Sequence, residues 1–514
     1  MSLFSAHQRH RRTRRTRRPG LQRRRPGTGQ TDPAHAPGGP PGSASTAPAR
    51  RLQPTPCCRA CAAGADQAQT LGRGVARHPL TAPETRHPRV AGRFPTGAVL
   101  HGFRRGRSGP DRVMLHGPER RMTMAAGDAV QVRPARGSLR PLVSGATLVA
   151  LLALLFGLPW WTLTVAARWP APVVAAGTSV FVVALVAFPV LMYLGHGRRR
   201  LDAAARAGDT LLGLVWILFV WALIGNAARL PLAAAGVADP ARSRAVAVGA
   251  AVVSVVLAVW GYAEAMRVPR VRRVDVTVDR LGAGLDGVRV VLLTDTHYGP
   301  INRARWSART TEVVNGLAAD IVCHTGDIAD GTVDQRRAQA APLGAVQARL
   351  ARVYVTGNHE YYGEAEGWVE HMRTLGWEPL HNRHLVVERG GARLVVAGVD
   401  DLTAASSGVA GHRADHAGAL AGADPRLPVL LLAHQPKQID DAVAAGVDLQ
   451  LSGHTHGGQM WPFHYLVRLD QPVVQGLSRH GQTQLYTSRG TGFWGPPFRI
   501  FAPSEITLLT LRVR

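Results

Sequence analysis

The first half of the chain contains four long apolar runs that are separated by short connections. They cover roughly residues 142–167, 171–194, 210–228 and 245–263. Each run is long enough to cross a hydrocarbon core of about 30 Å, which takes about 20 helical residues. Connections this short argue against four buried helices of a water-exposed domain. The pattern therefore predicts a four-helix transmembrane region over residues 141–266.

A second pattern of shorter apolar runs begins near residue 274 and continues to residue 514. Strand-like runs first alternate with helix-like segments. Strands are predicted at 288–294, 320–325 and 352–356, and helices at 306–317, 334–350 and 364–375. Further strands are predicted at 385–388, 394–399, 429–433, 449–452, 484–487 and 505–512. Such alternation indicates an α/β domain over 274–514, with many parallel strands in two packed sheets flanked by helices.

Residues 1–121 show no sustained apolar period and are rich in Arg, Pro and Gly. Such a segment cannot bury enough apolar surface to offset its chain entropy, so disorder is expected. A mis-assigned translation start is the alternative, because Met122 or Met124 would begin a protein just ahead of the first apolar run.

The net charge of +27 is unevenly distributed and does not indicate a nucleic-acid partner. Residues 1–121 contain 24 Arg and 5 acidic residues, a net +19. Lys437 is the only lysine in the 514 residues, and this bias towards arginine is typical of a GC-rich coding sequence. Arginine content is therefore weak evidence for nucleic-acid binding, and none is predicted.

Arginine placement predicts the orientation in the cell membrane. Arg198, Arg199, Arg200 and Arg206 lie between the second and third runs, and further arginines precede the first run and follow the fourth. The positive-inside rule then places both ends of the multi-pass region, and the domain that follows it, in the cytoplasm. The runs have no central acidic residue, which favours an anchor over a transporter. The sequence gives no indication of oligomeric state.

Seven candidate metal ligands follow the predicted strands. They are Asp295, His297, Asp327, Asn358, His434, His454 and His456. Strand ends that meet at one edge of a sheet can bring such donors together, and Asp327 can bridge two cations. Carboxylate, amide and imidazole donors suit divalent or trivalent Mn, Fe or Zn. The sequence therefore predicts a site for two metal ions.

Two adjacent cations favour the hydrolysis of phosphate esters. They lower the pKa of a shared water and stabilise an in-line displacement at phosphorus. His359, next to Asn358, is placed to contact the phosphate and to act as general acid for the leaving group. Arg489 precedes Gly490 in a predicted loop and is a weaker candidate for phosphate binding.

The motif order resembles the calcineurin-like metallophosphoesterase superfamily. The blocks are Asp295-Thr-His297, Gly326-Asp327, Gly357-Asn-His-Glu360, His434 and Gly453-His-Thr-His456. The resemblance implies a four-layer α/β/β/α sandwich with a dinuclear centre. It further implies that Asp295, His297 and His456 hold one metal, that Asn358, His434 and His454 hold the other, and that Asp327 bridges them.

Further segments resemble the bacterial membrane-associated subgroup of this superfamily. They are Gly398–Asp401, His434–Pro436, Gly457–Gln459 and Thr487–Gly492. The prediction is a membrane-anchored phosphoesterase that hydrolyses phosphomonoesters or phosphodiesters by attack of a metal-bridged hydroxide, with the lipid bilayer as partner and a substrate that could be lipid-linked. The alternative is a four-span transporter or sensor in which the phosphoesterase fold is a regulatory binding module.

Overall fold

The computed structural model describes residues 140–514, with side chains from residue 145 onward. The chain divides into two compact units, 1–124 and 125–514, and the described residues all belong to the second. The predicted disorder of residues 1–121 and the alternative start at Met122 or Met124 lie outside the described residues.

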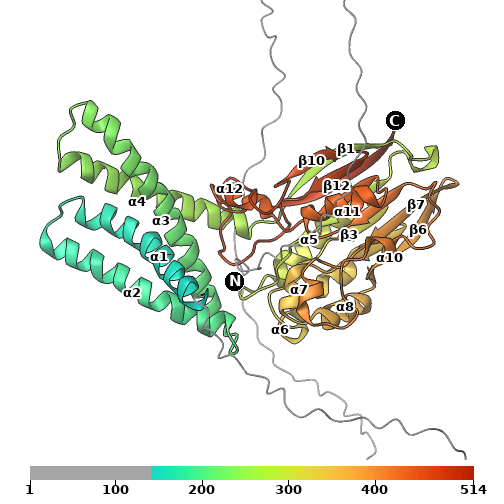
Figure 1. Ribbon diagram of the computed structural model, residues 1–514, viewed down its shortest axis with the longest axis horizontal. Helices are drawn as coiled ribbons and strands as arrows, with labels where there is room; N and C mark the ends of the chain where they lie inside the picture. Colours follow the sequence, from blue (N-terminus) through green and yellow to red (C-terminus); the bar gives the residue numbers. More distant parts are fainter. Residues whose placement is uncertain (1–139) are drawn as a thin grey trace, which may run out of the picture. The chain divides into compact units, whose positions relative to one another are not determined.

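Four long helices precede the strands (Figure 1). They are α1 (Arg140–Trp160), α2 (Ala171–His196), α3 (Asp202–Ala234) and α4 (Ala241–Met266). All four are long and apolar enough to cross a membrane, and a π-helical turn, η1 (Trp161–Val165), extends the first. Val180, Val183 and Val259 are among the large apolar side chains that remain exposed along them, as expected of a surface that lipid covers.

Polar side chains within these helices bond to neighbouring helices. The Asn226 amide on α3 donates to the Thr162 hydroxyl at 2.6 Å. Arg229 donates to the Ser243 hydroxyl on α4, also at 2.6 Å. Such bonds satisfy polar groups that a hydrocarbon environment would otherwise leave without partners. Because α3 also packs against α1 and α2, it is the central helix of this group.

The rest of the chain forms two six-stranded sheets. The strands are β1 (Arg270–Val278), β2 (Arg289–Leu293), β3 (Ile321–His324), β4 (Ala351–Tyr354), β5 (Glu378–Pro379), β6 (Arg383–Arg389), β7 (Ala392–Gly398), β8 (Val429–Leu432), β9 (Leu449–Ser452), β10 (Gly476–His480), β11 (Thr483–Thr487) and β12 (Glu505–Val513). One sheet has the order β1-β12-β2-β3-β4-β5 and the other β10-β11-β9-β8-β7-β6. In the first sheet, the neighbouring strands β2, β3, β4 and β5 run parallel to one another. In the second sheet, the same holds for β7, β8, β9 and β11.

Eight helices lie among or beyond the strands: α5 (Ala304–Gly316), α6 (Val333–Ala340), α7 (Asn358–Tyr362), α8 (Ala365–Thr374), α9 (Ala404–Ser407), α10 (His416–Ala419), α11 (Ile439–Ala444) and α12 (His464–Val467). Of these, α5, α6 and α8 cover the outer face of the first sheet, and α10 and α11 cover that of the second. In β2, Val290 and Leu292 belong to the core between the sheets, whereas Val291 and Leu293 pack with Val314 and Trp368 from the helices. A further core joins the second sheet to α11. This is the expected α/β/β/α sandwich.

The structure contains strands β1, β5 and β10, which were not predicted, and one predicted helix is shorter than expected. The helix predicted over 334–350 ends at Ala340, where a 3-10 turn containing Pro342 and Gly344 begins, because neither residue favours a continued helix. The strand β1 was not predicted, and it begins at Arg270, four residues before the predicted domain start. Its arginine-rich sequence forms a strand by pairing with β12 at the edge of the sheet.

Candidate metal centre

The predicted ligands stand just beyond the ends of parallel strands. Asp295 follows β2, Asp327 follows β3, and Asn358 follows β4. In the second sheet, His434 follows β8 and His454 follows β9. These strands are buried nearly throughout, and the loops that follow them bring the side chains from both sheets into one cluster.

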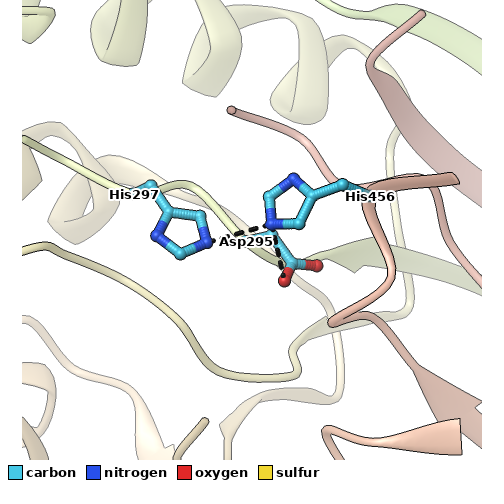
Figure 2. Close-up of side chains that lie close together, drawn as sticks. All are labelled: Asp295, His297 and His456. Atoms are coloured by element: carbon cyan, nitrogen blue, oxygen red, sulfur yellow. Dashed lines mark hydrogen bonds and ion pairs between the residues drawn. The ribbon is translucent and has the colours of Figure 1, made fainter. Parts of the chain in front are cut away.

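The first group of ligand candidates is Asp295, His297 and His456 (Figure 2). One donor atom from each lies within 4.8 Å of the others. The Nε2 atoms of the two histidines are 3.1 Å apart, and His456 Nε2 is 3.5 Å from Asp295 Oδ1. Three donors therefore face one small volume.

The second group contains Asp327, His434 and His454, whose donor atoms also lie within 4.8 Å of one another. His434 Nε2 lies 3.0 Å from Asn358 Oδ1 and 3.2 Å from His454 Nδ1. The amide oxygen of Asn358 thus belongs to this group.

Asp327 connects the two groups. Its Oδ2 is 3.5 Å from His297 Nε2 in the first group and 3.2 Å from His434 Nε2 in the second. All seven predicted ligands therefore meet in one cluster, with a carboxylate in the middle.

The backbone at this cluster is strained. Asp295, His297, Asp327, His454 and His456 all have positive φ angles, between 41° and 68°. Each such conformation in a non-glycine residue costs on the order of 1 kcal/mol or more, and persists only where the surroundings enforce it. Five strained residues among seven donors indicate that the loops are shaped for the site rather than for their own stability.

Two motif glycines allow the loops to approach this closely. A Cβ at Gly357 would lie 2.2 Å from Asp327 Oδ1, and a Cβ at Gly453 would lie 2.2 Å from Asp295 Oδ2. Any side chain at either position would displace a ligand carboxylate, which explains the glycines within these two motifs.

The electrostatics of the donors fit cation binding. Burial lowers the pKa of His454 to about 3, and burial with the nearby His297 and Arg499 lowers that of His456 well below its usual value. Both imidazoles are therefore neutral at pH 7, the form that binds metal. Burial raises the pKa of Asp295, a penalty that a bound cation would remove. The chemistry of the donor set thus fits two metal ions.

Three buried or half-buried residues that the sequence did not single out support this cluster. Asp330 Oδ1 lies 2.9 Å from His297 Nδ1 and 2.7 Å from His359 Nδ1. Glu360 accepts hydrogen bonds from the backbone N–H groups of Asp327 and Ile328. Arg499 donates to the carbonyl of His456 at 2.8 Å and lies 3.1 Å from its Nδ1. Glu360 was visible in the Gly-Asn-His-Glu motif, but the other two carry no local signal.

His359 lies at the edge of the cluster. Burial acts to lower its pKa, but the carboxylates of Asp327 and Asp330 outweigh this effect and raise the pKa to about 9. Its ring is 4.7 Å from that of His297 and 5.6 Å from that of Trp494. His359 is therefore a protonated imidazole beside the ligand groups.

Arg489 is adjacent to the cluster but already has one ion-pair partner. Its Nε donates to Glu505 on β12 at 2.7 Å. The next residue, Gly490, lies against Asp295 and His456. The guanidinium of Arg489 is thus anchored by Glu505 at the border of the site.

A further His-Asp-His group, formed by His381, Asp400 and His412, contains none of the seven predicted ligands. Asp400 Oδ1 lies 2.7 Å from His381 Nδ1, and the rings of the two histidines are 4.3 Å apart. His412 contacts the Tyr361 hydroxyl at 3.0 Å.

Known proteins match the region that carries these residues. The family model for calcineurin-like phosphoesterases matches residues 288–458. A "transmembrane protein with metallophosphoesterase domain" from Danio rerio is 40% identical over 270 residues, which are 51% of this chain and 62% of that protein. An uncharacterized metallophosphoesterase of Campylobacter jejuni is 34% identical over 263 residues, which are 51% of this chain and 68% of that protein. A dimetal phosphatase structure from Danio rerio covers 40% of this chain and 88% of its own, with 15% identity and a TM-score of 0.27.

The fold and the clustered donors are those of a metal-dependent phosphoesterase. The chain belongs to the calcineurin-like metallophosphoesterase family. Its match covers less than two thirds of the length of the Danio rerio transmembrane relative.

Proposed function

We propose that this chain is a membrane-anchored, dinuclear metal-dependent phosphoesterase. The observation that carries the proposal is the convergence of seven donors on strained loops from two sheets, with Asp327 between the two groups. Asp295, His297 and His456 would hold one cation. Asn358, His434 and His454 would hold the other, and Asp327 would contact both. Mn, Fe and Zn all suit this mixed oxygen and nitrogen set.

Two bound cations would supply electrostatic stabilisation at phosphorus and a water of lowered pKa. The protein residues orient the donors around them. Asp330 accepts from His297 Nδ1, so the lone pair of His297 Nε2 points to the cluster. Arg499 positions His456 through its carbonyl and Nδ1. These contacts fix the orientation of both imidazole rings.

His359 is assigned the role of general acid for the departing alkoxide. Asp330 engages its Nδ1 and favours the protonated form of the imidazole. Its Nε2–H is then available to donate to the leaving oxygen or to bind a phosphoryl oxygen. The Nη groups of Arg489 are a second source of hydrogen bonds to phosphate.

The substrate is proposed to be a phosphomonoester or phosphodiester that can be lipid-linked. The catalytic domain follows α4 directly, and loop residues near Met460 and near Ile500 contact α3 and α4. Phe498 and Ile500 pack with Ile217 of α3, and the Arg499 N–H donates to the Gly261 carbonyl of α4. A site held against apolar helices in this way suits an amphiphilic substrate. The arginines of the α2–α3 connection favour a cytoplasmic location for the domain.

The proposal is tested on the full-length protein, purified with Mn²⁺ and assayed with an aryl phosphodiester and an aryl phosphomonoester. We expect about two metal ions per chain and turnover of at least one ester. His359→Ala should lower kcat by about 10²-fold or more while the metal content stays unchanged.

Metal-loaded protein that hydrolyses neither ester would contradict the enzyme proposal and favour the regulatory binding module. Loss of metal in His359→Ala would contradict the assignment of His359 as general acid and make it part of the metal-binding framework.

A further inference from the structure

A pocket beside the first ligand group is lined by both the catalytic domain and a membrane helix. The domain contributes His297, Arg303 and Asp330, and α3 contributes Arg206 and Asp209. Of the residues that line this pocket, only His297 is one of the seven predicted metal ligands. The charged side chains of Arg206, Asp209 and Arg303 contact none of the seven predicted ligands through their carboxylate or guanidinium groups, except that Arg303 donates to the backbone carbonyl of His297. Uncharged residues form much of the rest of the lining, namely Gly299, Pro300, Ile301, Phe493, Gly495 and Pro497.

Arg303 is a buried cation that lacks a full set of acceptors. Its side chain lies between the rings of Trp306 and Phe493, at 4.5 Å and 4.4 Å from their centroids. Nη2 donates to the backbone carbonyls of Thr296 and His297, the latter at 2.7 Å. Nη1 is buried without a hydrogen-bond partner among the described residues. An unpaired buried donor of a charged group is costly, and an anionic ligand would satisfy it.

Arg206 provides a second uncompensated cation. It is exposed, and its guanidinium makes no ion pair or hydrogen bond among the described residues. On α3 it follows Asp202 by four residues and precedes Asp209 by three, so the three side chains share one face of the helix. That face is turned toward the catalytic domain, because Asp202 accepts from Arg336 at 2.7 Å and 2.5 Å.

The carboxylates of the pocket already have partners, unlike its arginines. Asp330 Oδ1 is engaged by His297 and His359. Asp209 Oδ1 pairs with His196 at 2.9 Å. The donors that remain available belong to Arg206 and Arg303, so the pocket has the character of an anion site.

The pocket lies where the polar start of α3 meets its apolar run. Residues 202–209 contain the charged side chains, and residues 210–228 are almost entirely apolar. Arg336, which holds Asp202, also donates through Nε to the carbonyl of Asp330 at 3.0 Å. The headgroup region of a bilayer is therefore the natural source of an anion for this pocket.

We propose that Arg206 and Arg303 form a subsite for a second phosphoryl group, so that the substrate is a lipid with two linked phosphates. This inference rests on the proposed phosphoesterase function. Water adds to the terminal phosphorus, the bond from that phosphorus to the bridging oxygen breaks, and the bridging oxygen leaves with the electron pair and accepts a proton. The products are the lipid monophosphate and inorganic phosphate. Arg206 and Arg303 bind the phosphate that stays on the lipid.

The test uses the full-length protein in nanodiscs with Mn²⁺ and a matched pair of substrates, farnesyl diphosphate and farnesyl monophosphate. Phosphate release gives kcat/KM for each. The wild type should prefer the diphosphate by about tenfold or more, and Arg206→Gln should reduce this preference by about tenfold, the usual effect of losing one charge-assisted hydrogen bond. Arg198→Gln removes an exposed charge from the α2–α3 connection that is not among the lining residues of the pocket, and it should leave the preference unchanged.

Equal kcat/KM values for the two lipids in the wild type, or an unchanged preference in Arg206→Gln, would overturn the subsite. If the wild type still hydrolyses an aryl phosphodiester in that case, the proposed function stands and only the inference fails. If metal-loaded wild type hydrolyses none of the substrates, both fail together. If Arg198→Gln lost the diphosphate preference as fully as Arg206→Gln, the preference would depend on the total surface charge and not on the pocket. That result would also overturn the subsite.

Discussion

The two groups of ligand candidates lie side by side but are supported in different ways. In the second group, His434 Nδ1 contacts the carbonyl of Thr325 at 2.7 Å, and Glu360 holds the backbone at Asp327. These partners come from the same motif loops as the ligands. In the first group, Asp330 engages His297 and Arg499 engages His456. Asp330 and Arg499 are in turn connected to the membrane helices by hydrogen bonds.

The difference indicates that one half of the centre is coupled to the bilayer anchor and the other half is not. Asp330 is bonded to Arg336, which binds Asp202 of α3, and the backbone of Arg499 bonds to Gly261 of α4. Thr325 and Glu360, which support the second group, make no hydrogen bond or ion pair to α3 or α4 among the described residues. Variants of the supporting residues should therefore separate the two halves.

Asp327→Asn should have the largest effect, because this residue contacts both groups. The amide retains the shape and tolerates the positive φ of 55°, but it removes the shared negative charge. We expect kcat/KM to fall about 10³-fold, together with loss of at least one metal ion per chain. Metal analysis and ester hydrolysis measure this, and full metal content with near-normal activity would contradict a bridging role.

Arg499→Lys should destabilise the first group and its contact with α4. The guanidinium of this fully buried residue donates to the carbonyls of His456, Arg489, Gly492 and Ala502, and an ammonium cannot reach all four. The expected loss is about 3 kcal/mol of unfolding free energy.

Thermal unfolding of Arg499→Lys should be compared with that of Arg479→Lys, which changes an arginine that is half exposed on β10. Equal melting temperatures for the two variants would show that Arg499 is not a structural link.

Asp330→Asn tests the support of His297 and His359 without removing a ligand. The pKa of Asp330 is held low by these two histidines, which outweigh the opposing effect of burial. Partners of metal-ligating histidines typically contribute 10- to 100-fold in affinity or activity, and a loss of that size is expected. Asp334→Asn, an exposed acid on α6, is the control. A loss of activity as large in the control would argue against a specific role for Asp330.

A small pH effect is expected at the His381–Asp400 pair, which belongs to neither group. The hydrogen bond to Asp400 raises the pKa of His381 above its ordinary value, despite partial burial. A raised pKa stabilises the fold fully below about pH 6.5, the unfolded value, and this contribution is lost as pH rises through the folded value.

His381→Gln should thus reduce stability at pH 5.5 by under about 1 kcal/mol and have no such effect at pH 9, since the His381 side chain is 40% exposed to solvent. His384→Gln, in which the histidine contacts a carbonyl instead of a carboxylate, is the matched control. A loss for His381→Gln that is independent of pH would contradict the ion-pair explanation.

The clustering of the seven donors could be predicted from the sequence because their motifs follow short apolar runs that end at a sheet edge. Asp295 and Asp327 are examples of acidic residues directly after such runs. Asp330 has no such signal, since it lies in a loop and is recognisable only by the two imidazoles it contacts. Arg499 was hidden for another reason: in a chain with 61 basic residues, nothing local marks one arginine as buried.

The pattern of apolar residues predicted the membrane helices and the two packed sheets flanked by helices. It did not predict the contacts between these two parts. The pairing of Asp202 with Arg336 joins residues that are 134 positions apart. The strand β1 was missed for the same reason, because its partner β12 lies at the far end of the chain. Such features depend on tertiary proximity, which no local pattern encodes.

The most direct test of the central claim is an anomalous-scattering map at the manganese edge from crystals of the Mn²⁺-loaded protein. The account predicts two peaks, one among Asp295, His297 and His456 and one among Asn358, His434 and His454, with Asp327 between them. A map with no peak at these residues, or with its only peak at His381, Asp400 and His412, would contradict it.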